Sequence, residues 1–108
     1  MITIEDFAKV EMKIGEILSV ELIPESEKLL RLSVNFGEEH PRQVLSGISK
    51  YFPEPHILVG KRCAFVTNLA PRMMMGLESQ AMILATSSDT SINLFEVSKD
   101  IPVGTKVK

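Results

Sequence analysis

The segment Val10-Glu11-Met12-Lys13-Ile14-Gly15-Glu16-Ile17-Leu18-Ser19-Val20-Glu21-Leu22 decides the fold. Along it, apolar residues alternate with mostly polar ones, which is the period of a β-strand. Gly15 lies inside this segment, where a glycine usually marks a bulge or a sharp bend. A long first strand that bends at a glycine predicts a small, strongly curved barrel.

Alternating segments elsewhere predict five further strands. They cover residues 30–36, 42–46, 63–69, 79–87 and 92–97. Thr3-Ile4-Glu5-Asp6 resembles a capping box and predicts a short helix that reaches Ala8. Residues 48–60 contain Pro53, Pro55 and Gly60, and they predict one or two short helical turns rather than a strand.

This order of elements predicts an all-β fold, with residues 1–108 as a single domain. Three strands, a small helical insert and then two strands are typical of a five-stranded OB-fold Greek-key barrel, here with a short N-terminal helix and a C-terminal extension. OB-folds bind oligonucleotides or oligosaccharides on a strand face and its loops. The strand pattern alone leaves an SH3-like barrel and other small β-folds open.

Composition excludes several classes of protein. With 44% hydrophobic and 24% charged residues in 108, the chain is expected to be globular rather than disordered. One cysteine, Cys63, excludes an internal disulfide framework, and we expect it to be a buried small hydrophobe. His40 and His56 are too few for a metal site. We expect a soluble cytoplasmic protein with no metal, no cofactor, no membrane contact and no catalytic site of its own.

The net charge of −2 conceals a marked segregation of charge. Residues 1–27 hold two basic and seven acidic side chains, whereas residues 28–76 hold seven basic and three acidic ones. In a barrel this basic middle supplies the second to fourth strands and the loops beside the expected binding face, with Lys28 and Arg31 opening the second strand. These charges can contact phosphates; ordinary solvated surface charge is the alternative.

The densest motif is Asn68-Leu69-Ala70-Pro71-Arg72-Met73-Met74-Met75-Gly76-Leu77-Glu78-Ser79-Gln80-Ala81-Met82. Three consecutive methionines cannot all point inward, so we expect at least one to be exposed near the tip of a loop. Methionine is flexible and polarizable, which suits adaptable contact surfaces. A loop folded back onto the core is the alternative.

Several motifs occur in a fixed order that resembles the tRNA-binding domain family. They are residues 6–15, 27–32, 46–48, 59–61 and the block 68–82. The resemblance runs from about Thr3 to Val107. Members of this family occur as free dimeric tRNA-binding proteins, as C-terminal domains of methionyl-tRNA synthetases and in the endothelial-monocyte-activating polypeptide group. A secretion-associated chaperone branch shares the fold.

The resemblance implies an OB barrel, a homodimer and tRNA recognised by shape at its outer corner. It assigns Lys28 and Arg72 to phosphates, and Met75 and Met82 to packing on sugar or base. It assigns Ser46, Asn68 and Ser79 to hydrogen bonds with phosphate or 2′-hydroxyl groups. We expect Arg31, Arg42 and Lys50 to act as accessory steering charges. An aminoacyl-tRNA synthetase is a further implied partner.

Two residues depart from the family pattern. Met73 stands where the family usually carries a lysine, and Ala81 stands where it favours glycine. Both bear on affinity more than on the fold. Two other functions therefore stay open: a peptide-binding, chaperone-like dimer of the same fold, and a structural dimerisation module that has lost RNA binding.

Overall fold

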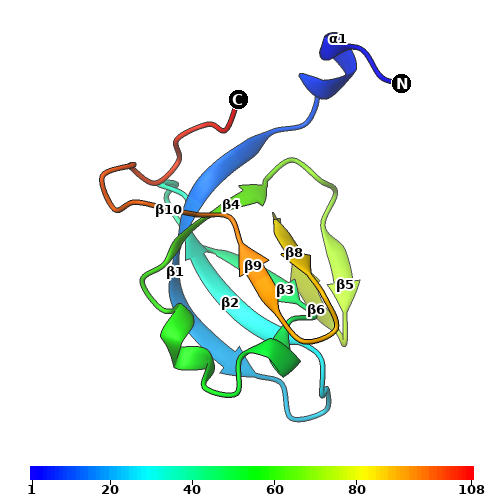
Figure 1. Cartoon of the computed structure of the whole chain (residues 1–108), viewed down its shortest axis with the longest axis vertical. Coiled ribbons are helices and arrows are strands. Elements are labelled where there is room, and N and C mark those ends of the chain that lie inside the picture. Colours follow the sequence, from blue (N-terminus) through cyan, green and yellow to red (C-terminus); the bar gives the residue numbers. More distant parts are fainter.

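The computed structural model describes residues Met1–Lys108, which form an antiparallel β-barrel with short helical elements (Figure 1). One six-stranded sheet has the order β10-β4-β1-β2-β3, with β7 also paired to β4. Two small hairpins, β5–β6 and β8–β9, extend from it. The strands are β1 Met12–Leu22, β2 Leu30–Asn35, β3 Arg42–Ser46, β4 Arg62–Val66, β5 Arg72–Met74, β6 Leu77–Ser79, β7 Met82–Ile83, β8 Ala85–Ser87, β9 Ile92–Leu94 and β10 Glu96–Val97. The all-β OB-type prediction is confirmed.

The long strand β1 serves two neighbours. Its first part, Met12 to Glu16, pairs with β4, and its second part, Glu16 to Leu22, pairs with β2. The sequence predicted a bulge or bend at Gly15. In the structure the strand register shifts slightly further along, between Ile17 and Ser19. Gly15 is needed for close packing instead: a Cβ there would lie 2.6 Å from atoms of Phe36 and Val34.

Residues 79–83 close the barrel between β3 and β4. The main-chain amide of Gln80 donates to the carbonyl of Gln43 on β3 at 2.8 Å, and Ile83 then pairs with Phe65 on β4. Because the chain must cross from one strand edge to the other, the predicted fifth strand 79–87 is divided among the end of β6, β7 and β8. The predicted sixth strand is likewise split into β9 and β10, and the fourth ends at Val66.

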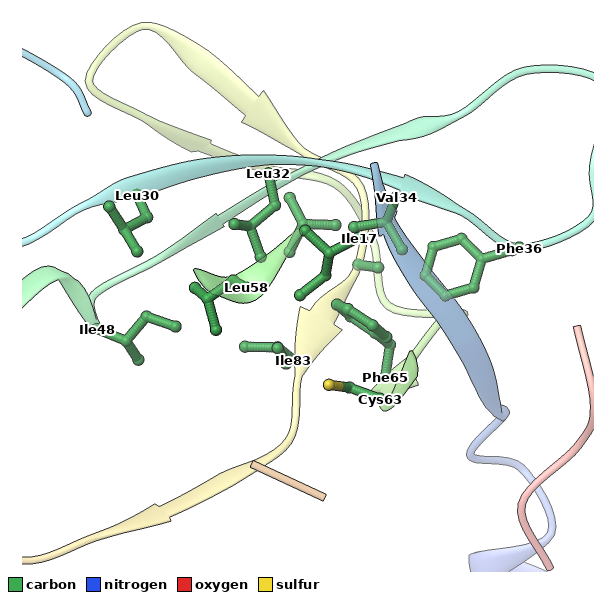
Figure 2. Close-up of a cluster of buried hydrophobic side chains, with 12 residues drawn as sticks. Ile17, Leu30, Leu32, Val34, Phe36, Ile48, Leu58, Cys63, Phe65 and Ile83 are labelled. Atoms are coloured by element: carbon green, nitrogen blue, oxygen red, sulfur yellow. The ribbon is translucent and has the colours of Figure 1, made fainter. Parts of the chain in front are cut away.

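The main core lies inside the barrel (Figure 2). Leu30, Leu32 and Val34 project from β2 into it, as their alternation predicted, and Phe65 meets them from β4. The rings of Phe36 and Phe65 make an edge-to-face contact with centroids 5.2 Å apart. Cys63 is fully buried in this core, and burial raises its pKa to about 11. This confirms the predicted role of Cys63 as a buried small residue.

A second, smaller core holds the β5–β6 hairpin against the barrel. Ile23, Leu29 and Leu45 are buried there, and Met74 and Leu77 of the hairpin pack on them. The methionines were expected near the tip of a loop, and the structure shows a regular hairpin there, in which Met74 pairs with Leu77 across a two-residue turn. Both turn residues, Met75 and Gly76, have positive φ (53° and 77°), as a type I′ hairpin turn requires.

The helical elements agree with the sequence prediction in place. Helix α1 spans Ile4–Phe7, one residue shorter than predicted, and Thr3 and Asp6 form the capping box. The insert consists of two 3₁₀ helices, η1 Ser49–Tyr51 and η2 Pro55–Leu58. Figure 1 shows α1 standing away from the barrel, on the same side as the C-terminal tail. No helix has the length and apolar character needed to cross a membrane.

Candidate nucleic-acid interface

The basic residues of the segment 28–76 divide into two groups. Three form ion pairs with carboxylates: Arg42 with Glu38 at 2.7 Å, Lys61 with Glu96 at 3.1 Å and Arg62 with Glu16 at 2.9 Å. The other four have no carboxylate within 4.0 Å: Lys28, Arg31, Lys50 and Arg72. The positive charge that can act on a ligand therefore comes mainly from these four side chains.

Arg42 holds the barrel together, which differs from the steering role expected of it. Its guanidinium makes two hydrogen bonds to the Glu38 carboxylate, at 2.7 and 2.8 Å. It also donates to the carbonyls of Thr67 (2.6 Å) and Gln80 (3.2 Å), and it lies 5.4 Å from the centre of the Phe36 ring. The hydrogen bonds between Arg42 and Glu38 lower the pKa of Glu38 and raise that of Arg42. Four of the five N–H groups of Arg42 thus donate within the chain.

The β5–β6 hairpin presents a mixed basic and apolar surface. Arg72 is exposed, and Met73 and Met75 keep 63% and 55% of their surface accessible. A groove of about 370 Å³ beside the hairpin brings together three predicted site residues, Arg72, Ser79 and Met82. Its other lining residues are apolar: Leu45, Leu69, Ala70 and Ala81. A cation above an apolar groove can accept a phosphate together with a sugar or base face.

The hydroxyl of Ser79 and the amide of Asn68 are used inside the protein. Ser79 is buried, and its Oγ accepts from the amide of Leu45 at 3.0 Å and donates to the carbonyl of Ala81 at 3.1 Å. Asn68 Oδ1 accepts from the amide of Glu11 at 2.8 Å, and its Nδ2 donates to the carbonyl of Lys9 at 2.7 Å. The Ser79 side chain thus positions the backbone beside the hairpin groove, whereas the Asn68 side chain positions the N-terminal segment.

Arg31 is tied to the hairpin through Gln43, a residue that sequence reasoning missed. Arg31 Nε donates to Gln43 Oε1 at 2.8 Å, and Gln43 Nε2 donates to the carbonyl of Glu78 in β6 at 2.9 Å. Gln43 pairs with Ser33 in the β2–β3 register, so both lie beside Arg31 in a hollow of about 290 Å³. The polar residues of the predicted second and third strands could have indicated this face.

Lys28 and Lys50 line one further hollow, of about 330 Å³. The amides of Lys28 and Leu29 donate to Ser26 Oγ at 3.2 Å, and the amide of Ser49 donates to the Lys28 carbonyl at 3.0 Å. Ser46, half-buried at the end of β3, directly precedes Gly47 in the lining. The loop that carries Lys28 is thereby fixed beside η1.

These features are connected in space. Leu29, next to Lys28, packs in the same small cluster as Met74 and Leu77 of the hairpin. We define the basic surface as Lys28, Arg31, Lys50 and Arg72 with the exposed methionines Met73, Met75 and Met82. Asn68 lies apart from it, in a groove of about 380 Å³ between α1 and the C-terminal tail. No group of three or more His, Cys, Asp or Glu side chains could hold a metal ion.

Comparison with known proteins gives consistent matches. The family described as "Putative tRNA binding domain" matches residues 12–106. Methionine–tRNA ligase of Methanospirillum hungatei is 49% identical over 107 residues, and that of Caldanaerobacter subterraneus is 45% identical over 106 residues. These matches cover 99% and 98% of this chain but only 16% of each ligase, so the chain spans about one sixth of these relatives.

Solved structures match along the whole chain. A MetRS-related protein from Pyrococcus horikoshii is 34% identical with a TM-score of 0.91, and the match covers 100% of this chain and 98% of that one. The chaperone CsaA from Bacillus anthracis is 28% identical with a TM-score of 0.86, and the match covers 100% of this chain and 99% of that one.

Proposed function

This chain belongs to the tRNA-binding domain family, and we propose that it binds folded tRNA through the basic surface. The observation that carries this proposal is that four basic side chains, Lys28, Arg31, Lys50 and Arg72, have no ion-pair partner in a protein of net charge −2. One of them, Arg72, lies beside the exposed methionines of the β5–β6 hairpin. Keeping cations unpaired among an excess of acidic residues leaves them available to an anionic ligand. Each phosphate that such a side chain neutralises adds about 0.7–0.9 to the salt slope of binding.

The proposed mode of recognition is by shape and backbone. Side chains cannot read the deep, narrow major groove of an A-form helix, so folded RNA is recognised through phosphates, 2′-hydroxyls and unstacked bases. Lys28 and Arg72 bind phosphates, with Arg31 adding charge beside them. Met75 and Met82 pack on sugar or base, and Ser46 bonds to a phosphate or 2′-hydroxyl. Ser79 and Asn68 act indirectly, by holding the backbone of the groove and of the N-terminal segment.

We propose that the module itself is non-catalytic and raises the affinity of a translation enzyme for tRNA. The ligase relatives support an appended domain, whereas the Pyrococcus horikoshii protein, with which the match is nearly end to end, supports a free-standing one. For either arrangement we propose a cytoplasmic location. Catalysis would belong to the other parts of a ligase or to a separate synthetase partner.

We also propose a homodimer joined through the N-terminal helix. Ile4, Phe7 and Val10 are exposed although apolar, and α1 buries no residue within the chain. They line the 380 Å³ groove together with Val107 of the C-terminal tail. A second copy would cover this apolar surface and set two basic surfaces on one particle, which raises apparent affinity through effective concentration. Light scattering should give about twice 12.0 kDa, and a single-chain mass would contradict the dimer.

A peptide ligand is the second candidate, because the groove at Arg72 is mostly apolar and the CsaA structure is named a chaperone. The unpaired cations favour RNA over an apolar peptide. The two ligands differ in their dependence on salt, since apolar peptide binding releases no condensed counterions.

The test is a titration of labelled tRNA at several salt concentrations. Lys28→Glu and Arg72→Glu should each weaken binding about tenfold or more and reduce the salt slope. Lys99→Glu is the matched control, because Lys99 is exposed and free of ion pairs. It follows β10, at the opposite end of the sheet order from β3, and it lines none of the hollows that hold Lys28, Arg31, Lys50 or Arg72. Absence of tRNA binding at low salt, or equal losses in all three variants, would overturn the proposal.

A further inference from the structure

A hollow between η1 and the β8–β9 hairpin is separate from the groove beside the β5–β6 hairpin and has a different lining. Eight residues line it: Lys28, Gly47, Ile48, Lys50, Tyr51, Ala85, Ser87 and Ile92. Two are lysines and none is acidic, although the protein carries more acidic than basic side chains. Its volume of about 330 Å³ lies at the lower end of the range for small-molecule sites.

Contacts within the chain position Lys28 and Lys50, and none of these contacts is with a carboxylate. Lys50 Nζ lies 4.9 Å from the centre of the Tyr51 ring, a cation–π contact that orients the ammonium and keeps its charge. Tyr51 is fixed in turn, because its hydroxyl donates to the carbonyl of Ser88 at 2.9 Å. The backbone of Lys28 is anchored by Ser26 and Ser49. Neither lysine forms an ion pair within the chain.

The rest of the lining suits the non-phosphate part of a nucleotide. Ile48 and Ile92 supply an apolar wall, and Ser87 carries a hydroxyl that can bond to a ribose. Gly47 is exposed, and a Cβ there would meet nothing within 4 Å, so its backbone is open to a ligand. Cations beside an apolar wall match the polarity of one nucleotide unit.

From this geometry we propose a second RNA subsite, in which Lys28 and Lys50 hold one phosphate and the hollow takes the attached nucleoside. The proposal rests on the proposed tRNA binding and extends it. Lys28 is the junction, because its neighbour Leu29 packs against the β5–β6 hairpin while its own side chain lines the hollow. A single RNA strand can therefore run from Arg72 past Lys28 to Lys50.

The test compares Lys50→Glu, Lys50→Arg and the control Lys99→Glu in tRNA titrations across a range of salt. Lys50→Glu should weaken binding about 5- to 10-fold near 0.1 M salt and lower the slope by about one, the contribution of one phosphate. Lys50→Arg, which keeps the charge, should bind within about twofold of the unsubstituted protein. If Lys50→Glu behaves as Lys99→Glu does while Arg72→Glu loses binding, the subsite is refuted and the tRNA function stands.

A second measurement separates RNA from a free nucleotide. Adenosine monophosphate, titrated into isotopically labelled protein, should shift the amide signals of Gly47, Ser87 and Ile92 only weakly, and tRNA should displace it. Tight binding of adenosine monophosphate that tRNA does not displace would overturn the proposal, because the hollow would then be a separate nucleotide site.

Discussion

Replacement of Met75 by asparagine should raise stability and lower RNA affinity at the same time. Met75 has φ +53° at the first position of the type I′ turn, where an ordinary L-residue costs about 1–2 kcal/mol. Asparagine tolerates this conformation, and Asn-Gly is the preferred pair for such a turn. We expect Met75→Asn to recover about 0.5–1 kcal/mol, which corresponds to a rise of roughly 2–6 °C in Tm.

The loss of affinity follows from the exposed methionine surface. Full burial of a methionine side chain contributes about 1.5–3 kcal/mol. Met75 keeps 55% of its surface accessible, so its cover by a sugar or base should contribute about 1 kcal/mol, or roughly a fivefold change in Kd. Thermal unfolding measures the first effect, and fluorescence anisotropy with labelled tRNA measures the second.

Two control variants separate the contributions. Met73→Asn adds the same side chain to β5, where φ is not positive, so it should not raise Tm. Val59→Asn removes an exposed apolar side chain that follows η2, an element that packs on β1, and Val59 lines neither the groove nor the small core beside the hairpin. This variant should leave tRNA affinity unchanged. A fall in Tm for Met75→Asn would refute the argument that Met75 is strained. Unchanged tRNA affinity of the same variant would refute a contact between Met75 and the RNA.

Three further predictions concern the barrel. Gly15→Ala should destabilise the protein by about 1–3 kcal/mol in urea unfolding, because its Cβ would press on the Phe36 ring; a neutral effect would contradict the close packing. Arg42→Met should cost about 2 kcal/mol through lost charged hydrogen bonds, and equal urea midpoints would show that the guanidinium is dispensable. Hydrogen bonds from Thr67 and Arg42 lower the pKa values of Glu11 and Glu38 respectively. Both carboxylates therefore stabilise the fold at pH values above their ordinary pKa of 4.5. This stabilisation is lost as the pH falls through their lower pKa values in the folded protein. Both groups are partly exposed, so each contributes less than about 1 kcal/mol, and Glu38→Gln should flatten the decline in urea midpoint toward pH 3.

Most of the barrel could be predicted because its strands have clear alternation. Leu30, Leu32 and Val34 recur at every second position and all enter the core. The β5–β6 hairpin could not be predicted in the same way. Three methionines in a row show no alternation, and methionine is not a turn residue, so nothing in residues 73–75 indicates a type I′ turn.

The sequence predicted those site residues whose role depends on their charge. It did not predict the roles that depend on hydrogen bonds to residues far away in the sequence. Lys28 and Arg72 lie exposed and unpaired, as their place in the basic segment indicated. The hydrogen bonds that occupy Asn68 join residues 57 and 59 positions apart in sequence, and the hydrogen bond that Ser79 accepts from Leu45 comes from β3. Such pairings arise only once the barrel closes, so a single sequence gives no local sign of them.

The central claim is that tRNA meets the basic surface, and amide-signal mapping of the labelled protein during a tRNA titration tests it most directly. Loss of signal should begin at Lys28, Lys50 and Arg72 to Met75, and the segment around Lys99 should be affected last. Early loss confined to α1 and the C-terminal tail, with Lys28 and Arg72 unchanged, would contradict the account.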